Sequence, residues 1–134
     1  MENITNRWLY MMIITAISVL AATGYSIAGI FEPSSILPHG ADPNKASLIF
    51  ALYAAARTIP LALISFIVIF KRLDWAILIL GILSGTIQLF DSFVGIYQQD
   101  AVKSLLPLLI ALMQFVGVLL VIRPARVPDE HSNI

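Results

Sequence analysis

Arg57 is a cation in the middle of one long apolar segment, and Asp91 is an anion in the middle of another. A guanidinium binds carboxylates and other oxyanions, and a carboxylate can accept or release a proton during catalysis. A charge at the centre of a bilayer costs about 2.5–3.5 kcal/mol on insertion scales, so such residues usually face a bundle interior and pair. We therefore predict that Arg57 and Asp91 are counter-ions and the candidate catalytic residues of an intramembrane site.

The apolar segments that carry these residues have the length of membrane spans. Their boundaries are 8–31, 46–70, 75–97 and 104–122. Only 12% of the 134 residues are charged, whereas soluble domains have about 25%, and a helix needs about 20 apolar residues to cross a bilayer. The sequence thus predicts an all-α membrane protein, an antiparallel four-helix transmembrane bundle. It would form a single domain over residues 1–134, with a polar tail at 123–134.

The distribution of basic residues predicts the orientation of the bundle. One side of the predicted bundle has five Lys and Arg residues, namely Arg7, Lys71, Arg72, Arg123 and Arg126. The other side has Lys45 and Lys103. Because short loops rich in Lys and Arg stay in the cytoplasm, we expect both termini there and the loop "EPSSILPHGADPNK" outside. The localisation expected is a bacterial inner membrane, crossed several times.

The polar side chains within the spans lie at similar depths. With a rise of 1.5 Å per residue, Arg57, Gln88 and Gln114 lie about 14–16 Å below the outer boundary, and Asp91 lies about 9 Å below it. Span 75–97 also carries its small and polar residues at helical spacing, on one stripe. The members of this stripe are Gly81, Ser84, Gly85, Gln88, Asp91, Ser92 and Gly95. We expect this stripe to face the interior of the bundle.

Two tyrosines and a glutamate complete the predicted site. Tyr53 lies one helical turn before Arg57, on the same face, and Tyr25 lies in the outer part of the first span. We predict an interior cluster that opens outward, with Glu32 at its mouth. Around the catalytic candidates Asp91 and Arg57, the ligand-binding residues would be Tyr25, Tyr53, Gln88, Gln114 and Glu32.

This cluster favours a pocket for a lipophilic small molecule. Arg57 would bind an anionic or carbonyl oxygen, while Asp91 would serve as acid or base in an isomerisation, a cyclisation or an epoxide opening, without a cofactor. In the alternative, Arg57–Asp91 is a structural ion pair in an accessory subunit of a membrane complex. An oligomeric transporter is disfavoured, because the inner half of the spans lacks a polar path.

The segment from Gly81 to Gly85 has small residues one helical turn apart. Such a pattern allows two helices to approach closely. The approach could be made within the chain, or with a homo-oligomeric or other membrane partner.

Composition excludes several kinds of chemistry. The chain has no cysteine, so disulfides, thiol redox reactions and cysteine-ligated metals are excluded. Its two histidines, His39 and His131, lie outside the spans, which excludes a bis-histidine haem within the bundle. The net charge is zero, so nothing favours binding to nucleic acid. We expect no metal ion and no cofactor.

Three short motifs resemble the DoxX-like group and related small four-helix membrane families. The motifs "AARTIPLAL", "FKRLDWAILILG" and "QLFDSFVG" place Arg57, Asp91 and Gly95 where those families have the same residue types. The resemblance covers roughly residues 10–122. It implies a four-helix membrane fold; some members resemble subunits of quinone-linked oxidoreductases, and distant relatives isomerise sterols.

The sequence departs from that resemblance in two ways. Its spans contain no histidine and no paired glutamates, unlike those of the sterol isomerases, and Pro60 stands where related sequences tend to have glycine. The resemblance therefore implies Arg57 and Asp91 as a site, and no particular reaction.

Overall fold

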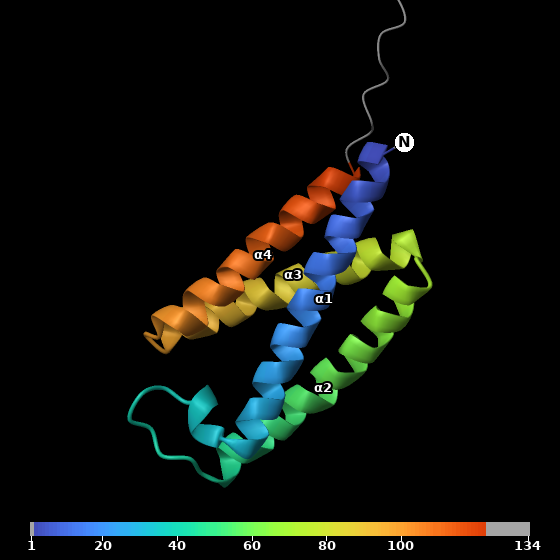
Figure 1. The fold of residues 1–134 in the computed structure, drawn as a ribbon. Coiled ribbons are helices and arrows are strands. Elements are labelled where there is room, and N and C mark those ends of the chain that lie inside the picture. Colours follow the sequence, from blue (N-terminus) through green and yellow to red (C-terminus); the bar gives the residue numbers. More distant parts are fainter. Residues whose placement is uncertain (1, 123–134) are drawn as a thin grey trace, which may run out of the picture.

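The computed structural model describes residues 2–122 of the chain, and within this range it contains helices and no strands. The helices are α1 (Glu2–Phe31), the short 3-10 helix η1 (Pro33–Ile36), α2 (Lys45–Phe70), α3 (Asp74–Tyr97) and α4 (Ala101–Ile122) (Figure 1). The predicted polar tail at 123–134 lies outside the described residues.

The prediction of four spans is confirmed: α1, α2, α3 and α4 are each long and apolar enough to cross a bilayer. Their bounds match the predicted ones within a few residues, except that α1 begins at Glu2, before its apolar part. At α4 the helix begins before the predicted span because Asp100 caps it, accepting hydrogen bonds from the backbone N–H groups of Val102 and Lys103. The described residues thus form a four-helix membrane bundle.

Helix α2 also begins at a defined cap. The Asn44 side chain accepts a hydrogen bond from the Ser47 N–H at 3.0 Å, and the Ser47 hydroxyl accepts one from the Asn44 N–H at 3.1 Å. This reciprocal pair satisfies donors that the first turn would otherwise leave exposed. Further along, Pro60 lies inside the helix without ending it.

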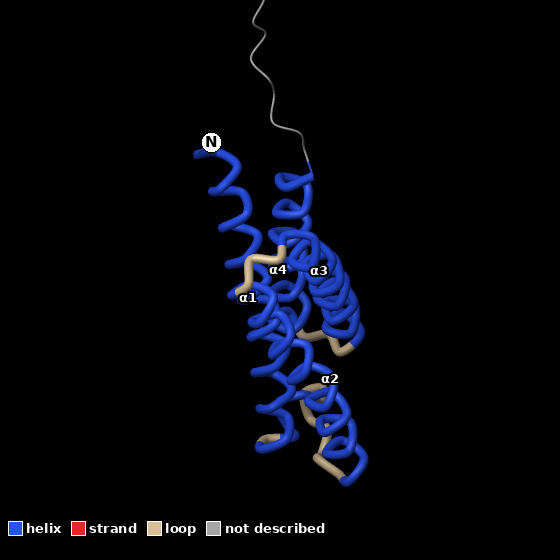
Figure 2. The backbone as a smooth tube through the Cα atoms, turned by 90° about the vertical axis from the view of Figure 1, so that its right-hand side faces the viewer, coloured by secondary structure: helices blue, strands red, loops and turns tan. Residues whose placement is uncertain are grey.

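The packing of the four helices is unequal. Helix α2 packs mainly on α1, and α3 packs mainly on α4, while α1 also contacts both α3 and α4. Helices α2 and α3 diverge from the turn that joins them, and α1 runs across the space between them (Figure 1). The rotated view likewise places α1 beside α2 and beside the pair formed by α3 and α4 (Figure 2). Direct contact between α2 and α3 is therefore slight.

The two ends of the bundle differ in composition. At the end where α2 turns into α3, called the turn end, an apolar core draws on all four helices: Met11, Ile14, Val68, Ile77, Leu78 and Val118. The opposite end, called the loop end, carries the segments 32–44 and 98–100. These segments are joined by hydrogen bonds, for example from the Gln98 amide to the Ile36 carbonyl at 3.3 Å.

Glycines allow α3 to lie close to its neighbours. A Cβ at Gly95 would overlap the backbone of Lys103 in α4, so α3 and α4 touch there through their main chains. A Cβ at Gly81 would meet Met11 and Gln114, and one at Gly85 would press on Gln114. Of the two arrangements predicted for Gly81 and Gly85, the structure shows packing inside this chain.

Candidate functional site

The structure does not bring the predicted polar cluster together. Gln88 and Gln114 are buried, with 3% and 0% of their surface exposed. In contrast Tyr25 and Tyr53 are 46% and 60% exposed, and Arg57 belongs with them on the outside of the bundle. Asp91 is also exposed. The prediction that these residues form one interior cluster is therefore wrong.

The reason lies in the face that α2 buries. This face consists of small residues that pack toward α1: Ser47, Ala51, Ala55, Ala62 and Ser65. At about 100° per residue, Arg57 projects roughly 120° away from the centre of that face. Because α1 rather than α3 covers α2, the side of α2 that carries Arg57 stays open.

Arg57 and Asp91 form no ion pair with each other in the structure. The ion pairs that do form include those of Asp100 with Lys103, at 3.5 Å, and with His39, at 3.6 Å. The prediction that Arg57 and Asp91 pair within one chain is therefore also wrong. Helices α2 and α3 each present one intramembrane charge that has no counter-ion among the described residues.

The two buried glutamines bind α1 instead of Arg57. Gln88 donates its amide hydrogen to the Ser18 carbonyl at 3.0 Å. Gln114 donates to the Thr15 hydroxyl at 2.9 Å and lies 3.6 Å from the Met11 sulfur. These bonds tie α3 and α4 to α1, so the role supported for both glutamines is to hold the bundle together.

A narrow groove lies where α1, α2 and α3 meet. Ser18 of α1, Thr58 and Leu61 of α2, and Ile87 and Gln88 of α3 contribute to its walls. Its enclosed space is about 10 Å³, which is about the room for one water molecule. Pockets for drug-sized ligands measure about 300–1,000 Å³, so the groove as it stands encloses no such ligand.

Arg57 and Asp91 do not line this groove, but each lies one helical turn from a residue that does. Arg57 is one helical turn before Leu61, and Asp91 is one turn after Ile87, so each charge shares a face with a groove-lining residue. Both steps lead toward the loop end, because α2 begins there and α3 ends there. Helical spacing therefore assigns one charge to the α2 side and the opposite charge to the α3 side of the groove, whose loop-end mouth is called the α2–α3 opening below.

The sequence did not predict the hydrogen bonds of Thr23 and Thr58, which lie near the groove. Ser26 and Thr58 share a hydrogen bond of 2.7 Å, and Thr23 donates to the Thr58 carbonyl at 3.2 Å, which joins α1 to α2. The Ser18 hydroxyl is buried and finds no hydrogen-bond partner among the described residues. The available signal was the presence of several Ser and Thr residues in the first span.

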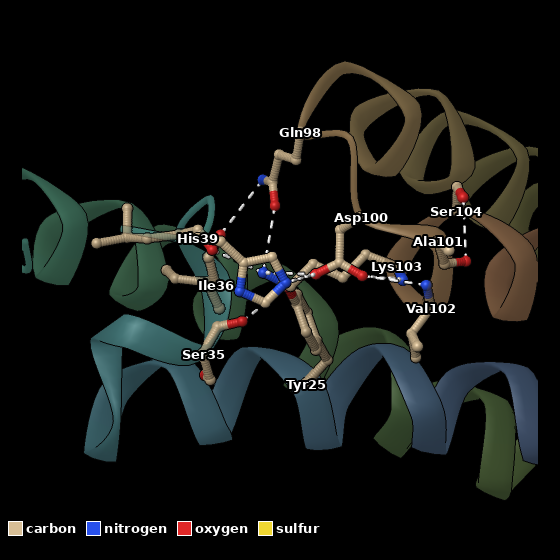
Figure 3. A network of polar contacts seen from close by, with 11 residues as sticks. Tyr25, Ser35, Ile36, His39, Gln98, Asp100, Ala101, Val102, Lys103 and Ser104 are labelled. Atoms are coloured by element: carbon tan, nitrogen blue, oxygen red, sulfur yellow. Dashed lines mark hydrogen bonds and ion pairs between the residues drawn. The ribbon is translucent and has the colours of Figure 1, made fainter. Parts of the chain in front are cut away.

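A second polar network joins the two loops at the loop end (Figure 3). The Lys103 ammonium donates to the Leu37 carbonyl at 2.7 Å and to the Gln98 side chain at 3.3 Å, and it also pairs with Asp100. His39, 89% of whose side chain is exposed, approaches Asp100 from the other loop. The hydrogen bond from the Lys103 backbone N–H, together with the Lys103 ammonium, lowers the pKa of Asp100 below its ordinary value.

Two further predicted residues belong to the loop end. Tyr25 donates its hydroxyl to the Ser35 carbonyl at 3.4 Å (Figure 3). Glu32 is exposed and accepts a hydrogen bond from the Ser34 hydroxyl, within its own short segment. Both residues therefore stabilise the loop beside α1. Among the described residues, no group of three His, Asp or Glu side chains could hold a metal ion.

Fold and site together define a class: a four-helix membrane bundle with one intramembrane cation and one anion exposed on two sides of an opening. No family model, no curated protein and no solved structure matches the chain. The function therefore has to be argued from the residues themselves.

Proposed function

We propose that the protein is a subunit of a membrane complex and that it binds its partner across the α2–α3 opening. The observation that carries this proposal is the exposure of Arg57 and Asp91, without an ion pair between them, on either side of that opening. The predicted structural pair Arg57–Asp91 would then form between chains rather than within one.

The energy of a bare charge in lipid supports this assignment. An unpaired arginine near the centre of a bilayer costs about 2.5–3.5 kcal/mol on insertion scales, and such residues pair or line a cavity. In an isolated chain neither Arg57 nor Asp91 has a counter-ion within the described residues. A partner that supplies the missing opposite charges removes this cost, so association is favoured.

The orientation of the subunit is part of the proposal. We propose that the four helices are antiparallel and that both termini lie in the cytoplasm, because Lys and Arg residues prefer that side. The loop end would then face outward, with the α2–α3 opening in the outer half of the bilayer. The proposed resemblance to the DoxX-like group agrees with a subunit role, since some members resemble subunits of oxidoreductase complexes.

The test measures association of the tagged chain in its native membranes. After extraction in a mild detergent, the wild-type chain should migrate in a complex, and both Arg57→Met and Asp91→Asn should release it. Lys71→Met and Asp74→Asn serve as matched controls, because Lys71 and Asp74 are exposed at the turn end. A complex that survives both intramembrane substitutions would refute the proposal.

A second candidate function is the binding of a lipophilic molecule in the groove. The observation in its favour is the buried Ser18 hydroxyl, which lines the groove and lacks a partner among the described residues. An unsatisfied buried hydroxyl costs about 1–3 kcal/mol, which a polar ligand group could recover. Arg57 would then bind an anionic or carbonyl oxygen of such a molecule, and Asp91 would transfer a proton to or from it.

This second candidate has its own measurement. Mass spectrometry of the purified protein should find a lipid or small molecule that Ser18→Ala removes and that Ser65→Ala retains. Ser65 is the matched control because its hydroxyl is also buried and unpartnered but does not line the groove. If both variants carry the same molecules as the wild type, the groove is not a ligand site.

A further inference from the structure

We infer that the partner at the α2–α3 opening is a second copy of this chain, in a two-fold dimer with reciprocal Arg57–Asp91 ion pairs. This inference rests on the proposed function, because it names the partner that the same opening takes. Its basis is the charge inventory of the spans and the arrangement of the two charges around the opening.

The charge inventory of the spans is balanced. Across 8–31, 46–70, 75–97 and 104–122, the sequence contains one basic residue, Arg57, and one acidic residue, Asp91. A different partner would have to supply both an anion and a cation at suitable depths. A second copy supplies both automatically, and two copies leave no intramembrane charge without a counter-ion.

The positions of the charges suit a two-fold axis. Arg57 is on the α2 side of the opening and Asp91 is on the α3 side, each one turn from a groove-lining residue toward the loop end. A rotation of 180° about an axis along the membrane normal exchanges the two sides. Arg57 then faces the partner subunit's Asp91, and the second pair forms by symmetry, as in any isologous interface.

The two charges are close enough in depth for this pairing. The axis preserves depth, and along the helices Arg57 and Asp91 differ by only about 7 Å. A long, flexible arginine side chain can cover that difference. Figure 1 shows α2 inclined to α3, so the difference in depth along the membrane normal departs from this count along the helices.

Exposed aromatic residues surround the proposed interface. Tyr53 lies one turn from Arg57, and Phe90 directly precedes Asp91; both are more than half exposed. Aromatic residues and arginine are enriched in the cores of protein interfaces. Tyr53 and Phe90 can therefore exclude lipid around the ion pairs, which strengthens the pairs by lowering the local dielectric constant.

The decisive experiment exchanges the charges between two differently labelled chains. Arg57→Asp gives a chain with two intramembrane anions, and Asp91→Arg gives a chain with two cations. In liposomes, energy transfer between labels should show that each variant alone dimerises at least about tenfold more weakly than the wild type, because like charges face each other. A mixture of the two variants should regain the dimer, since both facing pairs are then attractive.

The outcomes separate this inference from the proposed function. Single variants that dimerise as well as the wild type, or a mixture that stays dissociated, would overturn the two-fold dimer. If the pure wild-type chain stays monomeric while native membranes hold it in a complex that depends on Arg57, the inference fails and the proposed function stands. Both fail if no association anywhere depends on Arg57.

A crosslinking measurement covers the case in which charge-reversed chains fail to fold. The natural chain has no cysteine, so Arg57→Cys in one copy and Asp91→Cys in the other introduce a single thiol each. A short thiol-reactive crosslinker should join the two copies, and the second ion pair remains intact in that dimer. Placing the second thiol at Leu109, exposed on α4, should abolish the product. Equal yields from the two combinations would overturn the inference.

Discussion

Two helix pairs in this bundle are joined by turns of the same kind, yet one pair closes and the other opens. The turns 71–73 and 98–100 each have a central residue with positive φ, Arg72 at 50° and Gln99 at 56°. Each turn also closes with the same backbone hydrogen bond, which spans five residues and ends at Leu73 or Asp100. The turns therefore do not explain why α3 packs along α4 but diverges from α2.

Side-chain size on the facing helices explains the difference. Helix α3 meets α4 at Gly95, where the two backbones touch, and at Gly85. Helix α2 contains no glycine, and the groove between α2 and α3 is lined by larger side chains that include Leu61 and Ile87. Small residues on α2 are instead turned toward α1. In this molecule packing surfaces, rather than connection length, decide which helices pair.

The largest expected effect comes from breaking the closed pair. In Gly95→Ala the new methyl group would overlap the Lys103 carbonyl and the Ser104 nitrogen, which belong to the backbone and cannot turn aside. We expect a loss of about 2–3 kcal/mol in the free energy of unfolding, measured in mixed micelles. Gly24→Ala is the matched control, since nothing lies within 4 Å of its added Cβ. Equal stabilities of the two variants would contradict the close approach.

A smaller loss should follow from removing the amide that joins the closed pair to α1. Gln114→Ala deletes the hydrogen bond to Thr15 and leaves space beside Met11. Because interhelical hydrogen bonds in membranes are worth about 0.6 kcal/mol on average and up to about 1.7, we expect a loss of about 1–2 kcal/mol. Met113→Ala, at a lipid-exposed position next in sequence, should lose less when unfolding is followed by the same method.

The two turns should respond alike to glycine. Both Arg72→Gly and Gln99→Gly relieve a positive φ in a residue with a Cβ, so each should stabilise the fold by about 0.5–1 kcal/mol. Thermal unfolding in detergent would measure both changes. Opposite signs for the two substitutions would show that the turns, and not only the facing side chains, differ between the open and closed pairs.

The smallest expected effect concerns the charges at the open pair. In the isolated chain Arg57→Met should change the free energy of unfolding by no more than about 0.5 kcal/mol, because Arg57 is exposed and unpaired with Asp91. The same substitution should abolish association, as proposed above. A loss above about 1 kcal/mol in the monomer would show that Arg57 forms a bond within its own chain.

Part of this organisation is predictable from the sequence. The four helices follow from hydropathy, and the buried stripe of α3 follows from helical spacing, since Ser84, Gln88 and Ser92 are all buried. Depth along each span is equally simple to count. Hydropathy, helical spacing and depth each depend on one helix at a time, which is why they can be predicted from the sequence.

The composition of the site required information about neighbouring helices. Matching depths suggested that Arg57 and Asp91 meet, but depth does not specify which face of α2 is covered. That choice depends on how Ala51 and Ala55 pack against α1, a contact between distant parts of the sequence. Matching depth also predicted Gln88 and Gln114 as partners of Arg57. In the structure they donate instead to the Ser18 carbonyl and the Thr15 hydroxyl of α1.

The hydrogen bonds of α1 have a consequence for the order of biosynthesis. Helix α1 leaves the ribosome first. The Ser18 carbonyl accepts its hydrogen bond from Gln88, which is 70 residues later in the chain, and the Thr15 hydroxyl accepts its hydrogen bond from Gln114, which is 99 residues later. At about 5–20 residues per second, Thr15 waits roughly 5–20 s for Gln114 to be synthesised. During that interval α2 is already available to pack on α1, and the fourth span completes the contacts of the first.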